Sequence, residues 1–103
     1  MGKRNWTVED NLVALYIAFF GLKDTRHSLK EIETIIPHKG FNMRVQQFIA
    51  IHTKGRAGLK SGLKSPLFIA LYKAFKGFNQ RKYVGFVNAI LEVKLKIRNS
   101  QVR

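Results

Sequence analysis

The sequence contains no cysteine, and this absence excludes disulfide bonds, thiolate metal sites and thiol nucleophiles. Long hydrophobic runs are missing as well. The longest one, residues 12–20, is much shorter than the roughly 20 residues that a membrane-spanning helix needs. No apolar segment with a small-residue cleavage site follows the first residues, so we expect no signal peptide. These absences predict a cytoplasmic protein, in the host cytoplasm if the source is viral.

Acidic residues are the second shortage, because six Asp and Glu stand against 19 Lys and Arg, giving a formal net charge of +13. The shortage is uneven along the chain. Residues 1–33 hold equal numbers of cations and acids, whereas Glu92 is the one acid among residues 34–103. A chain with one balanced part and one strongly basic part is typical of proteins that bind a polyanion, and nucleic acid is the first candidate.

Catalytic and metal-binding patterns are also lacking. The three histidines show no metal-ligand spacing with one another or with a carboxylate. The close pairs of acids fall in the first turns of expected helices, where capping and the helix dipole account for them. The doubled GLKS of residues 58–65 does not meet the G-x-x-x-x-G-K-[ST] spacing of a phosphate-binding loop. We therefore expect no enzyme activity, no metal and no cofactor.

Helix signals fill most of the chain. Thr7 with Asp10 predicts a capped helix over residues 7–20, and the SLKE sequence from Ser28 predicts a second one that Pro37 ends. Asn42 is expected to cap a third helix, since apolar side chains recur on one face of residues 42–54.

Two further helices are expected after the glycine-rich segment. Ser65 and Pro66 have the order of a cap and a first helical residue, and Asn79 is placed to cap the last helix. The tail EVKLKIR is compatible with a helix end or a short strand, and we favour the helix. The prediction is one all-α domain of about five helices, with a helix-turn-helix core at residues 7–54, a basic loop at 55–65 and a helical pair at 66–98.

The third helix carries side chains that suit base recognition. Arg can bond bidentately to guanine, and Asn or Gln to adenine, because their donors and acceptors match those base edges. These side chains gather in the N-terminal part of the helix, where a recognition helix meets the bases. The predicted base contacts are Asn42, Arg44, Gln46 and Gln47.

The segment GRAGLKSGLKSP at residues 55–66 has two interpretations. It is either a flexible linker or a clamp in which cations neutralise phosphates and glycines let main-chain N–H groups approach them. Basic and glycine-rich arms also follow minor grooves. The predicted phosphate contacts are Lys39, Lys54, Arg56, Lys60, Lys64, Lys73, Lys76, Arg81 and Lys82.

Two stretches, WTVEDNLVALYIAFFG and MRVQQFIAIHTKGRAGLKSGLKSP, resemble the small helical domain at the N-terminus of some HNH endonucleases and related phage and restriction proteins. The W-T-x-E-D opening is also similar to Myb/SANT-type helix-turn-helix domains. The resemblance covers about residues 5–76 and implies DNA recognition by a helical module. It does not imply a nuclease, because no His/Asn/His constellation of the HNH type follows. The matching positions are Trp6, Thr7, Glu9, Asp10, Arg44, Gln47, Phe48, Ala50, Gly58 and Leu59.

The sequence therefore predicts a double-stranded DNA-binding protein of the transcriptional or phage regulator type. Two alternatives stay open. One is structured RNA, on whose bases Tyr72, Phe78 and Tyr83 would stack if exposed. The other is a basic module that docks on an acidic protein and modulates it. A membrane-surface role is the least expected, and the last helix is the expected contact surface if the protein is a homodimer.

Overall fold

The computed structural model describes residues 6–101, and across this range the chain forms five α-helices and a short 3₁₀ helix, with no β-strand. The predicted all-α fold is confirmed. In chain order the elements are α1 (Val8–Phe20), α2 (Leu29–Ile35), α3 (Phe41–His52), η1 (Lys60–Lys64), α4 (Pro66–Phe75) and α5 (Gln80–Gln101).

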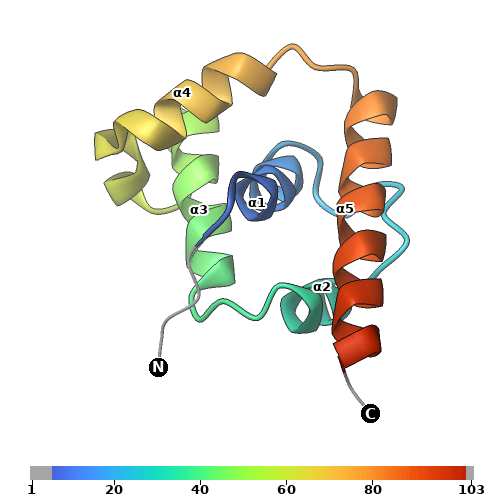
Figure 1. Ribbon diagram of the computed structural model, residues 1–103. Helices are drawn as coiled ribbons and strands as arrows, with labels where there is room; N and C mark the ends of the chain where they lie inside the picture. Colours follow the sequence, from blue (N-terminus) through green and yellow to red (C-terminus); the bar gives the residue numbers. More distant parts are fainter. Residues whose placement is uncertain (1–5, 102–103) are drawn as a thin grey trace.

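Helix α1 lies at the centre of the molecule, with the other helices around it (Figure 1). Residues 13–16 read Val-Ala-Leu-Tyr, and all four are fully shielded from solvent. A helix that is apolar on every side must be surrounded, so this run dictates the central position. The predicted capping box begins the helix: Thr7 Oγ1 accepts from Asp10 N, and the Asp10 carboxylate accepts from Thr7 N.

Helix α2 begins as predicted at Ser28, whose capping box with Glu31 is formed. It ends before Pro37, which has no N–H to continue the helix. The helix packs against α5 and contributes Ile32 and Ile35 to the common core. Because α2 is too short to be stable alone, this packing holds it in place.

The start of α3 differs from the prediction. Gly40, with a left-handed φ of 94°, precedes the helix, and no side chain caps it. Phe41 is drawn into the core and already belongs to the helix, so Asn42 lies in the first turn rather than at the cap. A glycine is needed here because a residue with a Cβ rarely adopts this backbone conformation.

Both predicted caps of the C-terminal pair are present. Ser65 Oγ accepts from Phe68 N at the start of α4, and Asn79 Oδ1 accepts from Lys82 N at the start of α5. Helix α5 then runs unbroken to Gln101, so the tail is helical, as favoured from the sequence.

Helix α5 is tied to α1 by hydrogen bonds between side chains and to the main chain, as well as by apolar packing. The Tyr83 hydroxyl donates to Leu12 O at 2.6 Å, and Gln80 Nε2 donates to the Tyr16 hydroxyl at 2.8 Å. Burial raises the pKa of Tyr83, so this hydroxyl stays a donor at any working pH. These bonds fix the N-terminal half of α5 beside α1.

Candidate nucleic-acid interface

Eight of the nine predicted phosphate contacts lie on four consecutive structural segments. These are the turn that follows α3, the η1 segment, α4, and the first turn of α5 with the turn before it. All eight side chains are exposed, and within the described part of the chain none forms an ion pair. We call this set the basic end. Its members are Lys54, Arg56, Lys60, Lys64, Lys73, Lys76, Arg81 and Lys82.

Figure 1 shows the segments of the basic end following one another along the upper edge of the molecule, away from α2. The acids lie elsewhere, on the first turn of α1, on α2 and on the later part of α5. Asp24 is the exception that borders the basic end, because its carboxylate accepts from Gln80 Nε2 at 3.3 Å. The charge asymmetry of the sequence is therefore also an asymmetry between two ends of the fold.

The glycine-rich loop is packed tightly onto α3. Leu59 N donates to Gln46 O at 3.0 Å. A Cβ on Gly58 would lie 2.2 Å from Gln46 O, and one on Gly62 would lie 2.2 Å from Gln47 O. Such distances are far below van der Waals contact, so only glycine allows the loop backbone to come this close. The loop is thus a fixed part of the fold, which a flexible linker would not be.

The doubled GLKS has a structural explanation. The glycine of each copy touches a backbone carbonyl of α3, and each lysine is exposed. The serines hold the two ends: Ser61 Oγ accepts from Gln47 Nε2 at 3.0 Å, and Ser65 caps α4. Each copy therefore anchors its backbone on α3 and presents its lysine to solvent.

The same packing changes what the loop offers to a phosphate. Gly55 N donates to Ala50 O and Gly62 N donates to Leu59 O, both within the protein. The N–H groups of these two glycines are therefore not free to bind a ligand, contrary to the prediction for Gly55 and Gly62. The exposed lysine side chains of the segment stay available for phosphate contacts.

Arg44 does not lie on an open recognition surface. Its guanidinium carbon is 4.0 Å from the centre of the Trp6 ring and 4.5 Å from that of Phe68. The guanidinium also donates to the Oδ1 of Asn11, a buried side chain on α1. Burial lowers the pKa of Arg44. Base reading by Arg44 stays a prediction, and these contacts disfavour it, because the planar group lies against two aromatic rings and a buried amide.

The other predicted base contacts are divided. Asn42 is exposed in the first turn of α3, whereas Gln46 and Gln47 are partly covered by the loop. Ala50, on the same helix, is fully buried because the loop crosses it. Lys39 is exposed but precedes α3, about 18 Å of helix away from Lys54. The structure brings together the loop and α4 cations, but not an open reading face on α3.

Replacing Arg44 by Ala should reduce stability rather than change base preference. The substitution removes two aromatic contacts and leaves Asn11 without its donor, so we expect a loss of about 2 kcal/mol. Chemical denaturation measures it. Met43→Ala is the control, because the neighbouring Met43 side chain is 55% exposed and its loss should change stability by less than about 0.5 kcal/mol. Unchanged stability together with altered base preference would restore Arg44 as a reader.

A buried charge cluster at the start of α1 was not found from the sequence. Asp10 is enclosed, with His38 Nε2 at 2.7 Å from one carboxylate oxygen and Lys94 Nζ at 2.9 Å from the other. Trp6 stacks on the His38 ring, with 4.3 Å between centroids. The capping pattern at Thr7 gave the local role of Asp10, but its partners are distant in the chain and follow no spacing rule.

Metal-binding and membrane-spanning features can be assessed over the same part of the chain. Among residues 6–101, no group of three or more His, Asp or Glu side chains is placed to hold a metal ion. Likewise, none of the helices described in that range combines the length and the apolar character needed to cross a bilayer.

Comparison with known proteins adds no assignment. No family model, no curated protein and no solved structure matches the chain. The similarity to the helical domains of HNH endonucleases and to Myb/SANT domains therefore stays a prediction from the sequence.

Proposed function

We propose that the protein binds double-stranded DNA through the basic end, mainly by contacts to backbone phosphates. The observation that supports this most is the exposure of eight cations on contiguous segments with no acid among residues 54–82. Neutralising phosphates releases condensed counterions from DNA. The favourable free energy of this release grows with the number of cations in contact with phosphates. A surface so rich in unpaired Lys and Arg suits a polyanion better than a single anionic group.

The loop also presents apolar side chains between its lysines. Leu59 and Leu63 are exposed beside Lys60 and Lys64, and Leu67 continues the row onto α4. Minor-groove proteins combine cations with apolar side chains that press against sugars and base steps. Because the outer face of α3 is partly covered, we place the DNA at the loop and α4 rather than at an inserted α3.

Burial of the candidate stacking residues disfavours the RNA alternative. Tyr83 is 1% exposed and its hydroxyl is occupied by Leu12 O, while Tyr72 and Phe78 are partly buried against neighbouring rings. Single-stranded RNA is usually read by bases stacked on open aromatic rings. An acidic protein partner would use the same cations as DNA, so it is an outcome that the experiment must separate.

The test is the salt dependence of binding to a short DNA duplex, measured by fluorescence anisotropy. The wild type should show a steep fall in affinity with salt. Lys60→Ala/Lys64→Ala should reduce the slope of log K against log salt by about 1.8, because each lost phosphate contact contributes about 0.9. The matched control is Lys30→Ala/Lys96→Ala, which removes two exposed lysines that lie outside the basic end. It should leave most of the slope unchanged.

Three results would count against the proposal. An affinity that does not change between low and moderate salt excludes phosphate binding as the main contribution. If both double variants lost the same amount of slope, the net charge of the protein, and not the position of the lysines, would determine binding. Stronger binding to a structured RNA of the same length in direct competition with the DNA duplex would favour the RNA alternative.

A further inference from the structure

Each copy of the doubled GLKS contains a leucine that stays in solvent when the loop packs on α3. Leu59 and Leu63 are 41% and 39% exposed, and Leu67, four residues further along, is 57% exposed. We call these three side chains the leucine row. A single exposed leucine is ordinary on a protein surface, but a group of them among the cations of the basic end indicates an interaction site.

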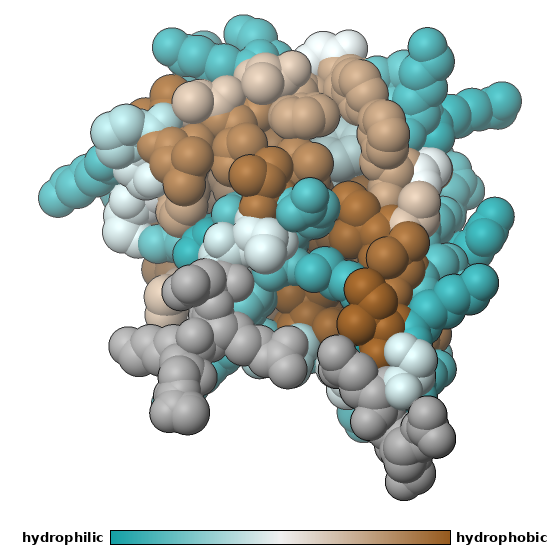
Figure 2. Space-filling model, viewed as in Figure 1, coloured by the Kyte–Doolittle hydropathy of each residue, from teal (hydrophilic) through white to brown (hydrophobic). Residues whose placement is uncertain are grey.

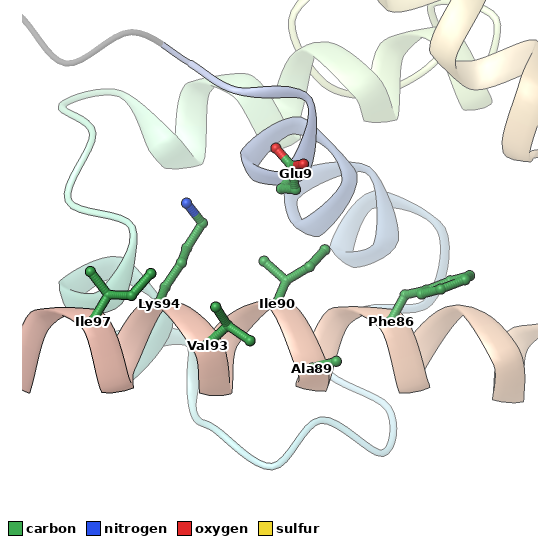
Figure 3. Close-up of a pocket in the computed structure, with 7 residues that line it drawn as sticks. All are labelled: Glu9, Phe86, Ala89, Ile90, Val93, Lys94 and Ile97. Carbon is green, nitrogen blue, oxygen red and sulfur yellow. The ribbon is translucent and has the colours of Figure 1, made fainter.

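A second apolar surface lies apart from the basic end, in an open groove of about 370 Å³ between α5 and the first turn of α1 (Figure 3). Figure 2 shows apolar side chains gathered along α5. The cation of the groove lining is Lys94, and its ammonium is paired with Asp10 at 2.9 Å. The leucine row differs, because exposed Lys60 and Lys64 directly follow two of its members. Charge therefore favours a polyanionic partner for the leucine row and not for the groove.

The backbone that carries the leucine row is held in place. Ser65 joins η1 directly to α4. Its N–H donates to Gly62 O at 3.2 Å, and its Oγ accepts from Phe68 N at 3.2 Å. The Phe68 ring packs on the fully buried Phe48 ring, with 5.1 Å between centroids. Leu67 is therefore fixed on the solvent side of the first turn of α4, next to a side chain that is anchored in the fold.

The leucine row gives the basic end a way to select DNA, and this step rests on the proposed function. Contacts from Lys and Arg to phosphates position a protein but carry no sequence information. The predicted base readers on α3 do not form an open surface, because Arg44 lies against two aromatic rings and the loop partly covers Gln46 and Gln47. Apolar side chains that enter the minor groove kink the duplex, and the free-energy cost of a kink depends on the DNA sequence.

We propose that the leucine row presses into the minor groove and bends the DNA that the basic end binds. Leu67 enters a base step, because it is the most exposed member of the row. Lys60 and Lys64 neutralise phosphates beside the opened step. The preferred substrate is therefore a duplex that bends easily, with flexible steps such as TA, rather than a stiff A-tract.

An anionic membrane surface also combines negative charge with an apolar layer. A helix that binds such a surface buries a continuous apolar face along its length. The leucine row occupies only η1, the residue before it and the first turn of α4, and the later apolar side chains of α4 pack on the core. A wedge at one base step needs no longer apolar face, so the structure favours DNA.

The first test measures how readily DNA ligase closes a linear duplex of about 150 bp, one persistence length, into a circle. The wild type should raise the rate of ring closure about tenfold, because a bend brings the two ends together. Leu63→Ala/Leu67→Ala should lose most of this increase. It should keep the salt slope of the wild type, because all cations are retained. Leu67→Met should still bend DNA, because methionine is also an apolar wedge.

Leu29→Ala/Val93→Ala is the matched control for the double variant. Its two side chains are 37% and 57% exposed, against 39% and 57% for Leu63 and Leu67, and they lie on α2 and in the groove of α5. This control should raise ring closure as much as the wild type does. Leu67→Ala alone changes one exposed side chain, so it should stay folded and still show a clear loss of bending.

The second test is a competition between two duplexes of equal length and base composition, one with central TA steps and one with an A-tract. The wild type should prefer the flexible duplex by about tenfold, because its bending costs less free energy. Leu63→Ala/Leu67→Ala should show a preference of less than about twofold, since the remaining phosphate contacts carry no sequence information.

The outcomes separate this inference from the proposed function. Salt-dependent binding of the wild type without any increase in ring closure would overturn the bending and leave the proposed function standing, whereas the absence of duplex binding would refute both. Equal ring closure by the wild type and Leu63→Ala/Leu67→Ala would exclude the leucine row as the cause of bending. Binding to phosphatidylserine vesicles that needs these leucines, without an effect on ring closure, would assign the row to a lipid surface.

Discussion

Gly58→Ala should lower the free energy of unfolding by about 3 kcal/mol. Gly58 has a φ of 79°, a conformation that a residue with a Cβ adopts at a cost of about 1 kcal/mol or more. The new methyl group would also lie 2.2 Å from Gln46 O and 2.7 Å from Ala50 N, both on the backbone of α3. A backbone atom cannot rotate away, so the loop must leave the helix. Thermal unfolding should show a decrease of roughly 15 °C.

Gly85→Ala is the control for this prediction. It is the same chemical change inside α5, with no atom within 4 Å of the new Cβ and no left-handed backbone. We expect it to stabilise the protein by about 0.5 to 1 kcal/mol, because alanine favours a helix more than glycine does. If Gly58→Ala were as stable as Gly85→Ala, the loop would not be packed on α3 as described. Under the proposed function, Gly58→Ala should also weaken DNA binding, since the loop lysines lose their fixed positions.

Asp10→Asn should cost about 2 kcal/mol of stability at neutral pH. The carboxylate caps α1 and is the partner of Lys94 and His38, which come from two other parts of the chain. Removing its charge leaves the Lys94 ammonium partly buried without a counter-charge. Lys94 keeps some contact with water, so the loss is smaller than for a fully buried pair. Glu9→Gln, an adjacent exposed acid, should change stability by less than about 0.5 kcal/mol.

The same variant separates the pH dependence of Asp10 from that of other acids. Burial raises the pKa of Asp10, but the hydrogen bonds from His38, Lys94 and Thr7 together outweigh it, and the net pKa lies below the ordinary value of 3.8. A lowered pKa means that the stabilisation is present above pH 3.8 and is lost as the pH falls through the folded-state value. Urea unfolding should therefore show a difference in the free energy of unfolding between wild type and Asp10→Asn at pH 7. This difference should become smaller below pH 3.8. A difference in the free energy of unfolding that does not change with pH would contradict the role of the Asp10 charge.

Much of the fold follows from local signals in the sequence. Capping residues at Thr7, Ser28, Ser65 and Asn79 begin four of the helices as predicted, because each satisfies free N–H groups within its own first turn. Such contacts join residues three or four apart, so the sequence alone specifies them. The start of α3 was predicted wrongly because the burial of Phe41, a long-range effect, decides where that helix begins.

The candidate site was predictable in its charges but not in its geometry. The cations of residues 54–82 are consecutive along the chain and stay exposed, so counting charges found them. Arg44, Gln46 and Gln47 were predicted to contact bases, but Phe68 lies against Arg44 and the loop partly covers the two glutamines. Periodicity describes one helix at a time and cannot show a neighbour that returns to cover it.

The sequence motif behind the family resemblance also has a structural role. Trp6 stacks on His38 and lies against Arg44, Thr7 caps α1, and Asp10 joins the buried charge cluster. These contacts stabilise the start of the first helix whatever the protein binds. The W-T-x-E-D opening therefore indicates a way of beginning a helical domain, and it does not by itself carry DNA recognition.

Helix α4 contributes partly covered side chains to the core but no fully buried one. Local opening of a segment is least costly where few apolar groups are withdrawn from water. The amide protons of α4 should thus exchange with solvent sooner than those of α1, whose residues 13–16 are fully buried. A bound polyanion would slow that exchange, and some of its binding free energy would be spent on holding this segment still.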